Sequence, residues 1–209
     1  MILLKGLYAI TDSKLTPKES ILDLVRFAIT GGAKIIQLRD KEKTDRELKD
    51  LAEKLCLLCR EMDAIFMVND RPELAAGIGA HGVHIGKDDT DISTARKLLP
   101  GGIIGVSCYN SIERAVEMER RGADYVAFGS LFPSPTKPGA VKAPLSLVQN
   151  AKMRLKIPVC GIGGITPENA KLAVDAGADM VAVISSLWKA ASVKEQAQRF
   201  SRLFKSDAL

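Results

Sequence analysis

Two aspartates follow neighbouring apolar segments of the chain and could hold a metal ion. Asp70 comes directly after the segment Ile65–Asn69, and Asp89 follows the next such segment, Gly82–Ile85. If both segments are parallel strands about 4.8 Å apart, their carboxylates can reach one ion at the same edge of the sheet. Mg²⁺ prefers oxygen ligands and is typically held by one or two carboxylates plus the phosphates of a substrate. The pair therefore predicts a site for magnesium and a diphosphate.

Each aspartate has an alternative role as a helix cap. Asp70 precedes Arg71-Pro72-Glu73, and Asp89 precedes the helical pattern Ile92–Leu98. Aspartate oxygens often accept hydrogen bonds from the first backbone N–H groups of a helix, and either residue alone would more often do so. Their occurrence after neighbouring strands favours the metal site.

A set of basic and amide side chains could meet the same diphosphate. At the end of the segment Ile35–Arg39, the alternate positions are Gln37, Arg39 and Lys41, so their side chains would point to the same side. Lys137 lies in a long proline-rich loop. Cations gathered around a leaving oxyanion neutralise its charge. Exposed lysines usually serve solubility, and that alternative stands for Lys41. The loop Phe132–Pro138 suggests a lid over the site.

Two glycine- and serine-rich segments near the carboxyl end could bind a phosphate. Gly161-Ile162-Gly163-Gly164 leaves backbone N–H groups free to converge on an anion, and Ile184-Ser185-Ser186 offers a second set. In a (β/α)₈ barrel, the loops after the seventh and eighth strands are the usual phosphate site. The alternative is a tight turn that needs glycine.

These residues follow a regular succession of short apolar segments that reads as eight strands. Each is rich in branched residues and is followed by a helical pattern, and this alternation predicts a parallel sheet. The expected strands are Leu7–Thr11, Ile35–Arg39, Ile65–Asn69, Gly82–Ile85, Ile103–Cys108, Tyr125–Gly129, Val159–Ile162 and Met180–Ile184. The clearest helices are expected over Pro17–Ile29, Asp45–Met62, Ser111–Arg120, Pro167–Ala176 and Val193–Phe204.

A recurring phrase favours closure of this sheet into a barrel. Gly31-Gly32-Ala33-Lys34, Gly79-Ala80-His81, Gly122-Ala123-Asp124 and Gly177-Ala178-Asp179 each end a helix and enter a strand. Such a repeat indicates equivalent βα units, with the glycine ending the helix. We therefore predict an α/β fold, a single (β/α)₈ TIM barrel with its active site at the C-terminal strand ends. The phrase itself indicates fold and not function.

The composition places the chain among ordinary globular proteins. With 209 residues and no break in composition, we expect one domain over residues 1–209. The net charge of +5 comes from basic residues dispersed beside acidic ones, and aromatics make up only 5%. Nucleic-acid binding is therefore not expected, and an anionic small substrate fits better. No long apolar run or leader pattern is present, so we expect a cytoplasmic protein without membrane contact.

The cysteines do not form a convincing metal or redox site. Cys56 and Cys59 make a Cys-x-x-Cys pair, but it lies inside a helical pattern, and neither His81 nor His84 has ligand spacing to another ligand. We expect core thiols there. Cys108 and Cys160 lie in apolar strands, where a free thiol behaves as a small hydrophobe.

The chain resembles a known family, thiamine phosphate synthase, over nearly its whole length. The resemblance rests on motifs that occur in the family's order. They are Gly6-Leu7-Tyr8-Ala9-Ile10-Thr11-Asp12, Gln37-Leu38-Arg39-Asp40-Lys41, Val68-Asn69-Asp70-Arg71, Gly82-Val83-His84-Ile85-Gly86, Ser134-Pro135-Thr136-Lys137-Pro138 and Gly161-Ile162-Gly163-Gly164-Ile165-Thr166. The resemblance implies that a hydroxymethylpyrimidine diphosphate is joined to a thiazole phosphate, or to its carboxylated form, giving thiamine phosphate and pyrophosphate with Mg²⁺.

Carried over by matching positions, the resemblance also implies a set of site residues. Contacts to the pyrimidine diphosphate would come from Gln37, Arg39, Lys41, Asn69, Ser107 and Lys137. Contacts to the thiazole phosphate would come from Ser134, Thr136, Gly164, Ile184 and Ser185, and Mg²⁺ would bind Asp70 and Asp89. Ser134 stands where the family often has threonine, so the hydroxyl is kept.

The family further implies a dissociative substitution, in which pyrophosphate leaves before the thiazole nitrogen attacks. Arg39, Lys41 and Lys137 would then be catalytic through their charge on the leaving group, and no side chain is needed as a nucleophile. Two alternatives remain: a thiazole phosphate tautomerase on a similar barrel, and a non-catalytic binder of thiamine precursors. The aspartate pair and Lys137 favour the synthase. Apolar helix faces could complete the barrel shell or form a homo-oligomer contact.

Overall fold

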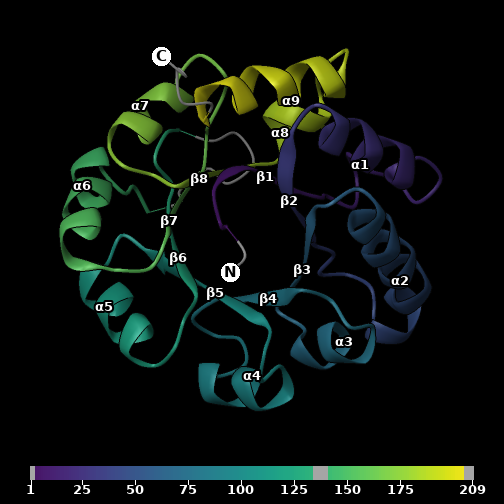
Figure 1. Ribbon diagram of the computed structural model, residues 1–209, viewed down its shortest axis with the longest axis horizontal. Coiled ribbons are helices and arrows are strands. Elements are labelled where there is room, and N and C mark those ends of the chain that lie inside the picture. Colours follow the sequence, from purple (N-terminus) through teal and green to yellow (C-terminus); the bar gives the residue numbers. More distant parts are fainter. Residues whose placement is uncertain (1–2, 134–140, 205–209) are drawn as a thin grey trace.

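The strands of this protein close into a parallel barrel, and the helices cover its outside (Figure 1). The computed structural model describes residues 3–133 and 141–204. Neighbouring strands pair in parallel around the whole ring, and β8 closes it by pairing with β1. The strands are β1 Gly6–Ile10, β2 Ala33–Leu38, β3 Ile65–Asn69, β4 Gly82–Ile85, β5 Ile103–Tyr109, β6 Tyr125–Phe128, β7 Val159–Ile162 and β8 Met180–Val183. The predicted (β/α)₈ barrel is confirmed.

Helices alternate with the strands, as the sequence predicts. They are α1 Ile21–Thr30, α2 Asp45–Glu61, α3 Pro72–Gly77, α4 Ile92–Leu98, α5 Ile112–Arg120, α6 Leu145–Arg154, α7 Ala170–Asp175, α8 Ser185–Trp188 and α9 Val193–Ser201. None of the described helices is long and apolar enough to cross a membrane.

Some element boundaries differ from the prediction. The helix expected from Pro17 begins only at Ile21, because Pro17 starts a turn in which its carbonyl accepts the N–H groups of Ser20 and Ile21 at 3.0 and 2.9 Å. The helix expected from Pro167 begins at Ala170, because Asn169 turns back onto the preceding loop.

Other differences amount to one or a few residues at the ends of elements. The last predicted helix ends its α-helical part at Ser201 and continues as a 3₁₀ turn over Arg202–Phe204. Four predicted strands run one residue beyond the observed strand ends. The extra residues are Thr11, Arg39, Gly129 and Ile184.

Two apolar cores follow from the alternation of side chains along each strand. One lies between the sheet and the helices and includes Leu7 and Phe66, both fully buried. The other fills the inside of the barrel, where Leu4, Met67 and Met180 are buried together. Along each strand, every second side chain points into the barrel. Polar residues at these inward positions must therefore lie beyond the inner core, toward the C-terminal ends of the strands.

The aspartate of the repeated Gly-Ala-Asp phrase connects the strand that follows it to the preceding strand. The Asp124 N–H donates to the carbonyl of Ile104, and its Oδ2 accepts the Ile104 N–H, both at 2.8 Å. Asp179 makes the same two bonds with Val159, also at 2.8 Å. The aspartate thus satisfies the first free N–H of a strand and sets its register with the next strand.

A basic residue from the helix before the paired strands completes this clamp. Arg96 reaches Oδ2 of Asp124 at 2.6 Å, and Lys152 reaches Oδ2 of Asp179 at 2.7 Å. His81 takes the aspartate's place in its copy of the phrase: its Nδ1 accepts the N–H of Phe66 at 3.0 Å. The phrase is structural, as the sequence predicts.

Replacing Asp124 with alanine should lower the free energy of unfolding by about 1–3 kcal/mol, since the Ile104 N–H loses its acceptor. Asp124→Asn keeps an acceptor oxygen and should retain most of the stability. Urea unfolding followed by circular dichroism measures both.

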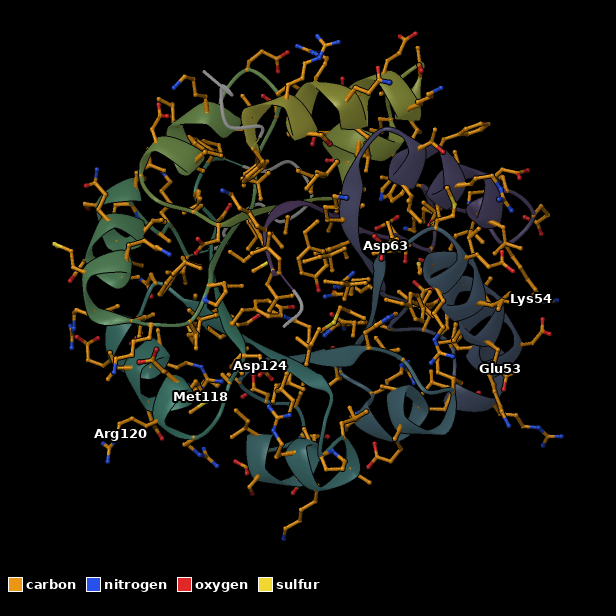
Figure 2. The ribbon with its side chains drawn as sticks, in the orientation of Figure 1. Glu53, Lys54, Asp63, Met118, Arg120 and Asp124 are labelled. Atoms are coloured by element: carbon orange, nitrogen blue, oxygen red, sulfur yellow. The ribbon has the colours of Figure 1, made fainter. Side chains whose placement is uncertain are left out.

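Asp50→Ala is the matched control, because Asp50 pairs with Lys54 on α2. Figure 2 shows Lys54 on the outer side of the barrel, away from Asp124. It should leave the unfolding midpoint unchanged. Equal losses for Asp124→Ala and Asp50→Ala would contradict the clamp.

Candidate active site

The predicted metal ligands and one predicted cation meet at the ends of β2, β3 and β4. Lys41 Nζ lies 3.0 Å from Oδ2 of Asp70, and Asp70 lies beside Asp89. The backbone of Asp70 is left-handed, with φ of 61°, a conformation that aspartate tolerates better than most residues. Its N–H donates to the carbonyl of His84 at 2.8 Å, which ties the end of β3 to β4. The expected closeness of the two aspartates is observed.

Asp89 carries the electrostatic signature of paired carboxylates. Its Oδ2 accepts the N–H of Gly86 at 2.7 Å, which turns the side chain back toward the rim. Burial raises the pKa of Asp89, and the adjacent Asp70 raises it further. Two carboxylates that repel each other favour a bound cation between them.

Neither aspartate caps a helix, so the alternative role fails for both. Helix α4 is capped by Asp91, whose side chain accepts the N–H of Ser93, and α3 begins after Arg71 without a side-chain cap. Asp70 and Asp89 are therefore available at the rim.

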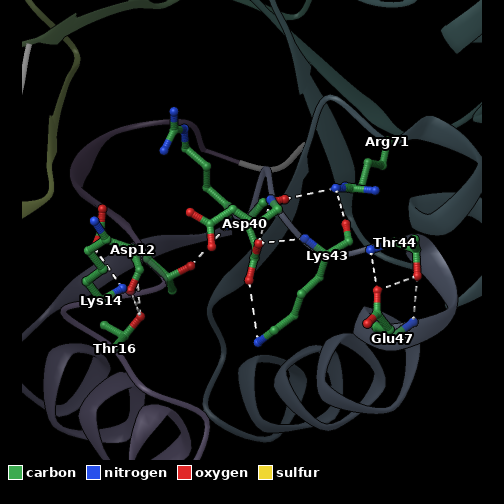
Figure 3. A network of polar contacts seen from close by, with 11 residues as sticks. Asp12, Lys14, Thr16, Asp40, Lys43, Thr44, Glu47 and Arg71 are labelled. Atoms are coloured by element: carbon green, nitrogen blue, oxygen red, sulfur yellow. Dashed lines mark hydrogen bonds and ion pairs between the residues drawn. The ribbon is translucent and has the colours of Figure 1, made fainter.

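A second network holds the loop that carries Lys41 against the end of β3. Arg71 donates to the carbonyls of Asp40 and Lys43 at 2.9 and 2.6 Å (Figure 3). It also donates to Oδ1 of Asp45 at 2.5 Å. The Asp40 side chain accepts the N–H groups of Glu42 and Lys43, at 2.9 and 3.1 Å. Burial raises the pKa of Asp40, but these N–H groups and the Lys43 ammonium together lower it more, so the carboxylate stays charged. Arg71 directly follows Asp70 in the sequence, but its spacing from Asp40, Lys43 and Asp45 gives no sign of this role.

The inward-facing positions at the C-terminal ends of β2 and β3 are occupied by Gln37, Arg39 and Asn69. Gln37 is buried inside the barrel, and its Nε2 donates to the hydroxyl of Tyr8 at 2.5 Å. The N–H of Arg39 donates to Oγ1 of Thr11 at 3.0 Å, which fixes the backbone where its side chain departs. Asn69 pairs in register with His84. The inward position of Gln37 agrees with the alternation predicted for this strand.

Ser107 reaches the same interior from β5. Its Oγ lies 2.9 Å from Nε2 of His84, and its carbonyl accepts Nε of Arg114 at 2.9 Å. Burial lowers the pKa of His84 to about 4, so the imidazole is neutral at pH 7. Both ring nitrogens of His84 have hydrogen-bond partners, the hydroxyls of Tyr125 and Ser107.

The loops after β7 and β8, which the sequence predicts as a phosphate cradle, lie against each other. Gly163 and Gly164 have φ of 95° and 64°, so their backbone takes a left-handed course that glycine permits. Ser186 Oγ donates to the carbonyl of Ile165 at 2.7 Å and joins the two loops. A Cβ on Gly164 would lie 2.4 Å from the carbonyl oxygen of Pro133, so the base of the preceding loop packs directly on this glycine.

Ile184 and Ser185 lie at the start of α8, beside this cradle. Ile184 is the residue before the helix, and Ser185 is its first residue. Ser134, Thr136 and Lys137 lie outside the described residues, as does most of the suggested lid Phe132–Pro138.

Comparison with known proteins agrees with this geometry. A family model described as thiamine monophosphate synthase matches residues 7–187. The chain belongs to this family. Thiamine-phosphate synthase of Nitrosococcus oceani is 47% identical over 205 residues, covering 97% of this chain and 94% of that protein. The homologue of the same name in Wolinella succinogenes is 49% identical over 187 residues, covering 88% and 86%.

A solved structure of the family shows the same fold. Thiamine phosphate pyrophosphorylase from Pyrococcus furiosus superposes with a TM-score of 0.88 at 38% identity, covering 95% of each chain. As a member of the thiamine monophosphate synthase family, the chain is a transferase of thiamine biosynthesis.

The family's expected metal fits the donor set at the rim. Within residues 3–133 and 141–204, no three His, Cys, Asp or Glu side chains gather around one point. The site thus offers two carboxylates, Asp70 and Asp89, which suits an ion that takes its other ligands from water and phosphate. A structural zinc site would need a closed set of protein ligands.

The cysteines take no part in the site. Cys56, Cys59, Cys108 and Cys160 are all free thiols and buried. Burial raises the pKa of Cys59 and Cys108 to about 12 and also raises the pKa of the other two. The expectation of core thiols is confirmed.

The native enzyme should therefore react with an aromatic disulfide reagent far more slowly than the unfolded chain, because a buried thiol is neither accessible nor ionised. In guanidinium chloride, all four thiols should react. The absorbance of the released thiolate counts them. A cysteine that reacts within seconds in the native protein would contradict this account.

Proposed function

We propose that this enzyme joins a hydroxymethylpyrimidine diphosphate to a thiazole phosphate, with release of pyrophosphate. The carboxylated thiazole phosphate is a second acceptor of the same class, and its reaction must also release the carboxyl group as CO₂. Membership of the family supports this assignment, and one observation at the site carries it. Lys41, Asp70 and Asp89 meet at three neighbouring strand ends, where a metal diphosphate would find both its counter-charge and its ligands.

The reaction proposed is a dissociative substitution. The bond between the pyrimidine methylene carbon and the diphosphate oxygen breaks first, and its electron pair leaves with pyrophosphate. The thiazole nitrogen then donates its lone pair to that carbon, forming the new C–N bond. No nucleophilic side chain is required, and the neutral His84 is held by hydrogen bonds inside the barrel.

Catalysis would come from charge placed around the leaving group. Arg39 and Lys41 follow β2 at alternate positions near the rim, and their positive charges would stabilise the departing diphosphate. Lys137, which lies outside the described residues, would do the same. Asp70 and Asp89 would hold Mg²⁺. When bound, this ion supplies two positive charges that offset the charge developing on pyrophosphate.

The second substrate would bind by its phosphate across the barrel mouth. Backbone N–H groups around Gly164 and at Ile184 and Ser185 suit a phosphate, and the positive φ of Gly164 turns that loop toward the rim. Ser134 and Thr136 would add hydroxyl groups. The two phosphate groups would then lie on opposite sides of the reacting carbon and nitrogen, and Gln37, Asn69 and Ser107 would surround the pyrimidine.

We also propose that the enzyme works in the cytoplasm as a catalyst of two phosphorylated small molecules. Four buried free thiols are usual for a reducing compartment. The basic residues pair with acidic neighbours on helix surfaces, as Lys54 does with Asp50, which does not suit a nucleic-acid or membrane surface.

Purified enzyme should release pyrophosphate only when both phosphorylated precursors and Mg²⁺ are present. The Asp70→Ala/Asp89→Ala double variant should lose at least about 10²-fold in rate, since the metal-bound leaving group is no longer held. A coupled phosphate assay with inorganic pyrophosphatase measures the release.

Asp91→Asn provides the matched control. It removes a carboxylate from the same loop but keeps a cap for α4, so the rate should stay near that of the native enzyme. Release that persists in the double variant would refute the metal site. No release by the native enzyme, with thiazole phosphate still bound, would favour the tautomerase.

A further inference from the structure

A chain of hydrogen bonds crosses the inside of the barrel beneath the pyrimidine site. It runs from Gln37 Nε2 to the Tyr8 hydroxyl (2.5 Å), to the Tyr125 hydroxyl (2.9 Å), to His84 Nδ1 (2.9 Å), and from His84 Nε2 to Ser107 Oγ (2.9 Å). Its two ends, Gln37 on β2 and Ser107 on β5, are residues that the proposed function assigns to the pyrimidine diphosphate. The three residues between them have no role in that assignment.

Packing holds this chain in place. The rings of Tyr8 and Tyr125 meet edge to face, with centroids 6.1 Å apart, and the His84 ring lies 5.6 Å from that of Tyr125. Glycine at position 105 makes room for the second phenol, because a Cβ there would lie 2.0 Å from Cζ of Tyr125. Burial also raises the pKa of both tyrosines, so each hydroxyl keeps its proton.

The donors and acceptors of the chain can be counted. The Gln37 amide uses an N–H toward Tyr8, so the oxygen of Tyr8 accepts there. Tyr8 then has one proton to give, and Tyr125 is the acceptor in contact. Tyr125 in turn gives its proton to Nδ1 of the neutral His84. His84 therefore carries its own proton on Nε2 and donates it to Ser107.

If the hydrogen bonds ran in any other direction, one hydroxyl proton would have no acceptor among these contacts. If Nδ1 of His84 donated to Tyr125, then either Tyr8 or Tyr125 would hold a hydroxyl proton that no acceptor in the chain takes. An unpaired buried donor is costly, so the one-directional arrangement is favoured. In that arrangement the oxygen of Ser107 is already an acceptor for His84, and its own proton is free to point out of the chain.

We propose that Tyr8, Tyr125 and His84 form a positioning relay that lets Gln37 hold Ser107 as a hydrogen-bond donor toward the bound pyrimidine diphosphate. This rests on the proposed function for the identity of the ligand. The hydrogen-bond relay itself belongs to the unliganded protein. If the residue at position 37 accepted a hydrogen bond from Tyr8, every hydrogen bond in the chain would reverse its direction. Ser107 would then donate its proton to His84 and could only accept a hydrogen bond from the ligand.

The tautomer of His84 tests the relay without substrate. In protein labelled with ¹⁵N-histidine at pH 7, long-range proton–nitrogen correlation should show a protonated Nε2 and an unprotonated Nδ1 for His84. A protonated Nδ1, or a doubly protonated ring, in the native protein would overturn the proposal. His81 is the internal reference, because its Nδ1 accepts the Phe66 N–H at 3.0 Å.

Substitution of Gln37 should then act at a distance. Gln37→Glu puts an acceptor beside Tyr8, so the proton of His84 should move from Nε2 to Nδ1, although the two residues share no contact within the chain. An unchanged tautomer in folded Gln37→Glu would overturn the coupling. Tyr125→Phe serves if that variant does not fold: His84 should lose its single tautomer, and an unchanged spectrum would again overturn the relay.

Tyr109→Phe is the matched control, since Tyr109 is the remaining tyrosine of the chain and its hydroxyl accepts from the N–H of Lys87, away from the relay. It should leave the His84 signals in place. A change equal to that of Tyr125→Phe would overturn the assignment of the relay.

Turnover separates this proposal from the proposed function. Tyr125→Phe should lower kcat/KM by about ten- to hundredfold, the range for one hydrogen bond to a charged group, and should add little to Ser107→Ala in the double variant. Fully additive losses would overturn the relay's action on Ser107. If native enzyme released no pyrophosphate, the proposed function would fall, while the tautomer result would still decide the relay.

Discussion

The closed parallel register of the barrel constrains where every functional side chain can lie. Because neighbouring strands pair in parallel and β8 returns to β1, all C-terminal strand ends meet on one rim. Alternation then sends every second residue inward, so Gln37, Asn69 and Ser107 converge although they are far apart in the chain. The clamps at Asp124 and Asp179 fix this register from the opposite end of the strands.

The interior of the barrel combines an apolar lower part with a polar upper part. Below, Leu4, Met67 and Met180 fill the space tightly. Above them, phenol, imidazole and amide groups would be costly to bury alone, yet among the described residues no buried side-chain nitrogen or oxygen lacks a partner. Because each of these groups has a hydrogen-bond partner, the hydrogen bonds inside the barrel run in one defined direction. That direction belongs to the fold before any substrate binds.

Much of the fold and site could be predicted from the sequence, because the signals were local. Strands such as Ile65–Asn69 are short apolar runs, and the metal pair follows two of them directly. The start of α1 could not be predicted, because the Pro17 turn depends on hydrogen bonds that proline and its neighbours make only once folded. Arg71 and the Tyr8–Tyr125 contact were missed because their partners lie 26 or more residues away, and no spacing rule reports such pairs.

The account depends most on one claim, that the carboxylates of Asp70 and Asp89 and the nearby cations form one site for a metal diphosphate. Isothermal titration of inorganic pyrophosphate, with and without Mg²⁺, tests it without the organic substrates. Mg²⁺ should tighten pyrophosphate binding at least about tenfold in the native enzyme, equal to about 1.4 kcal/mol, and should have no such effect in Asp70→Asn/Asp89→Asn. The same enhancement in both proteins would contradict the claim.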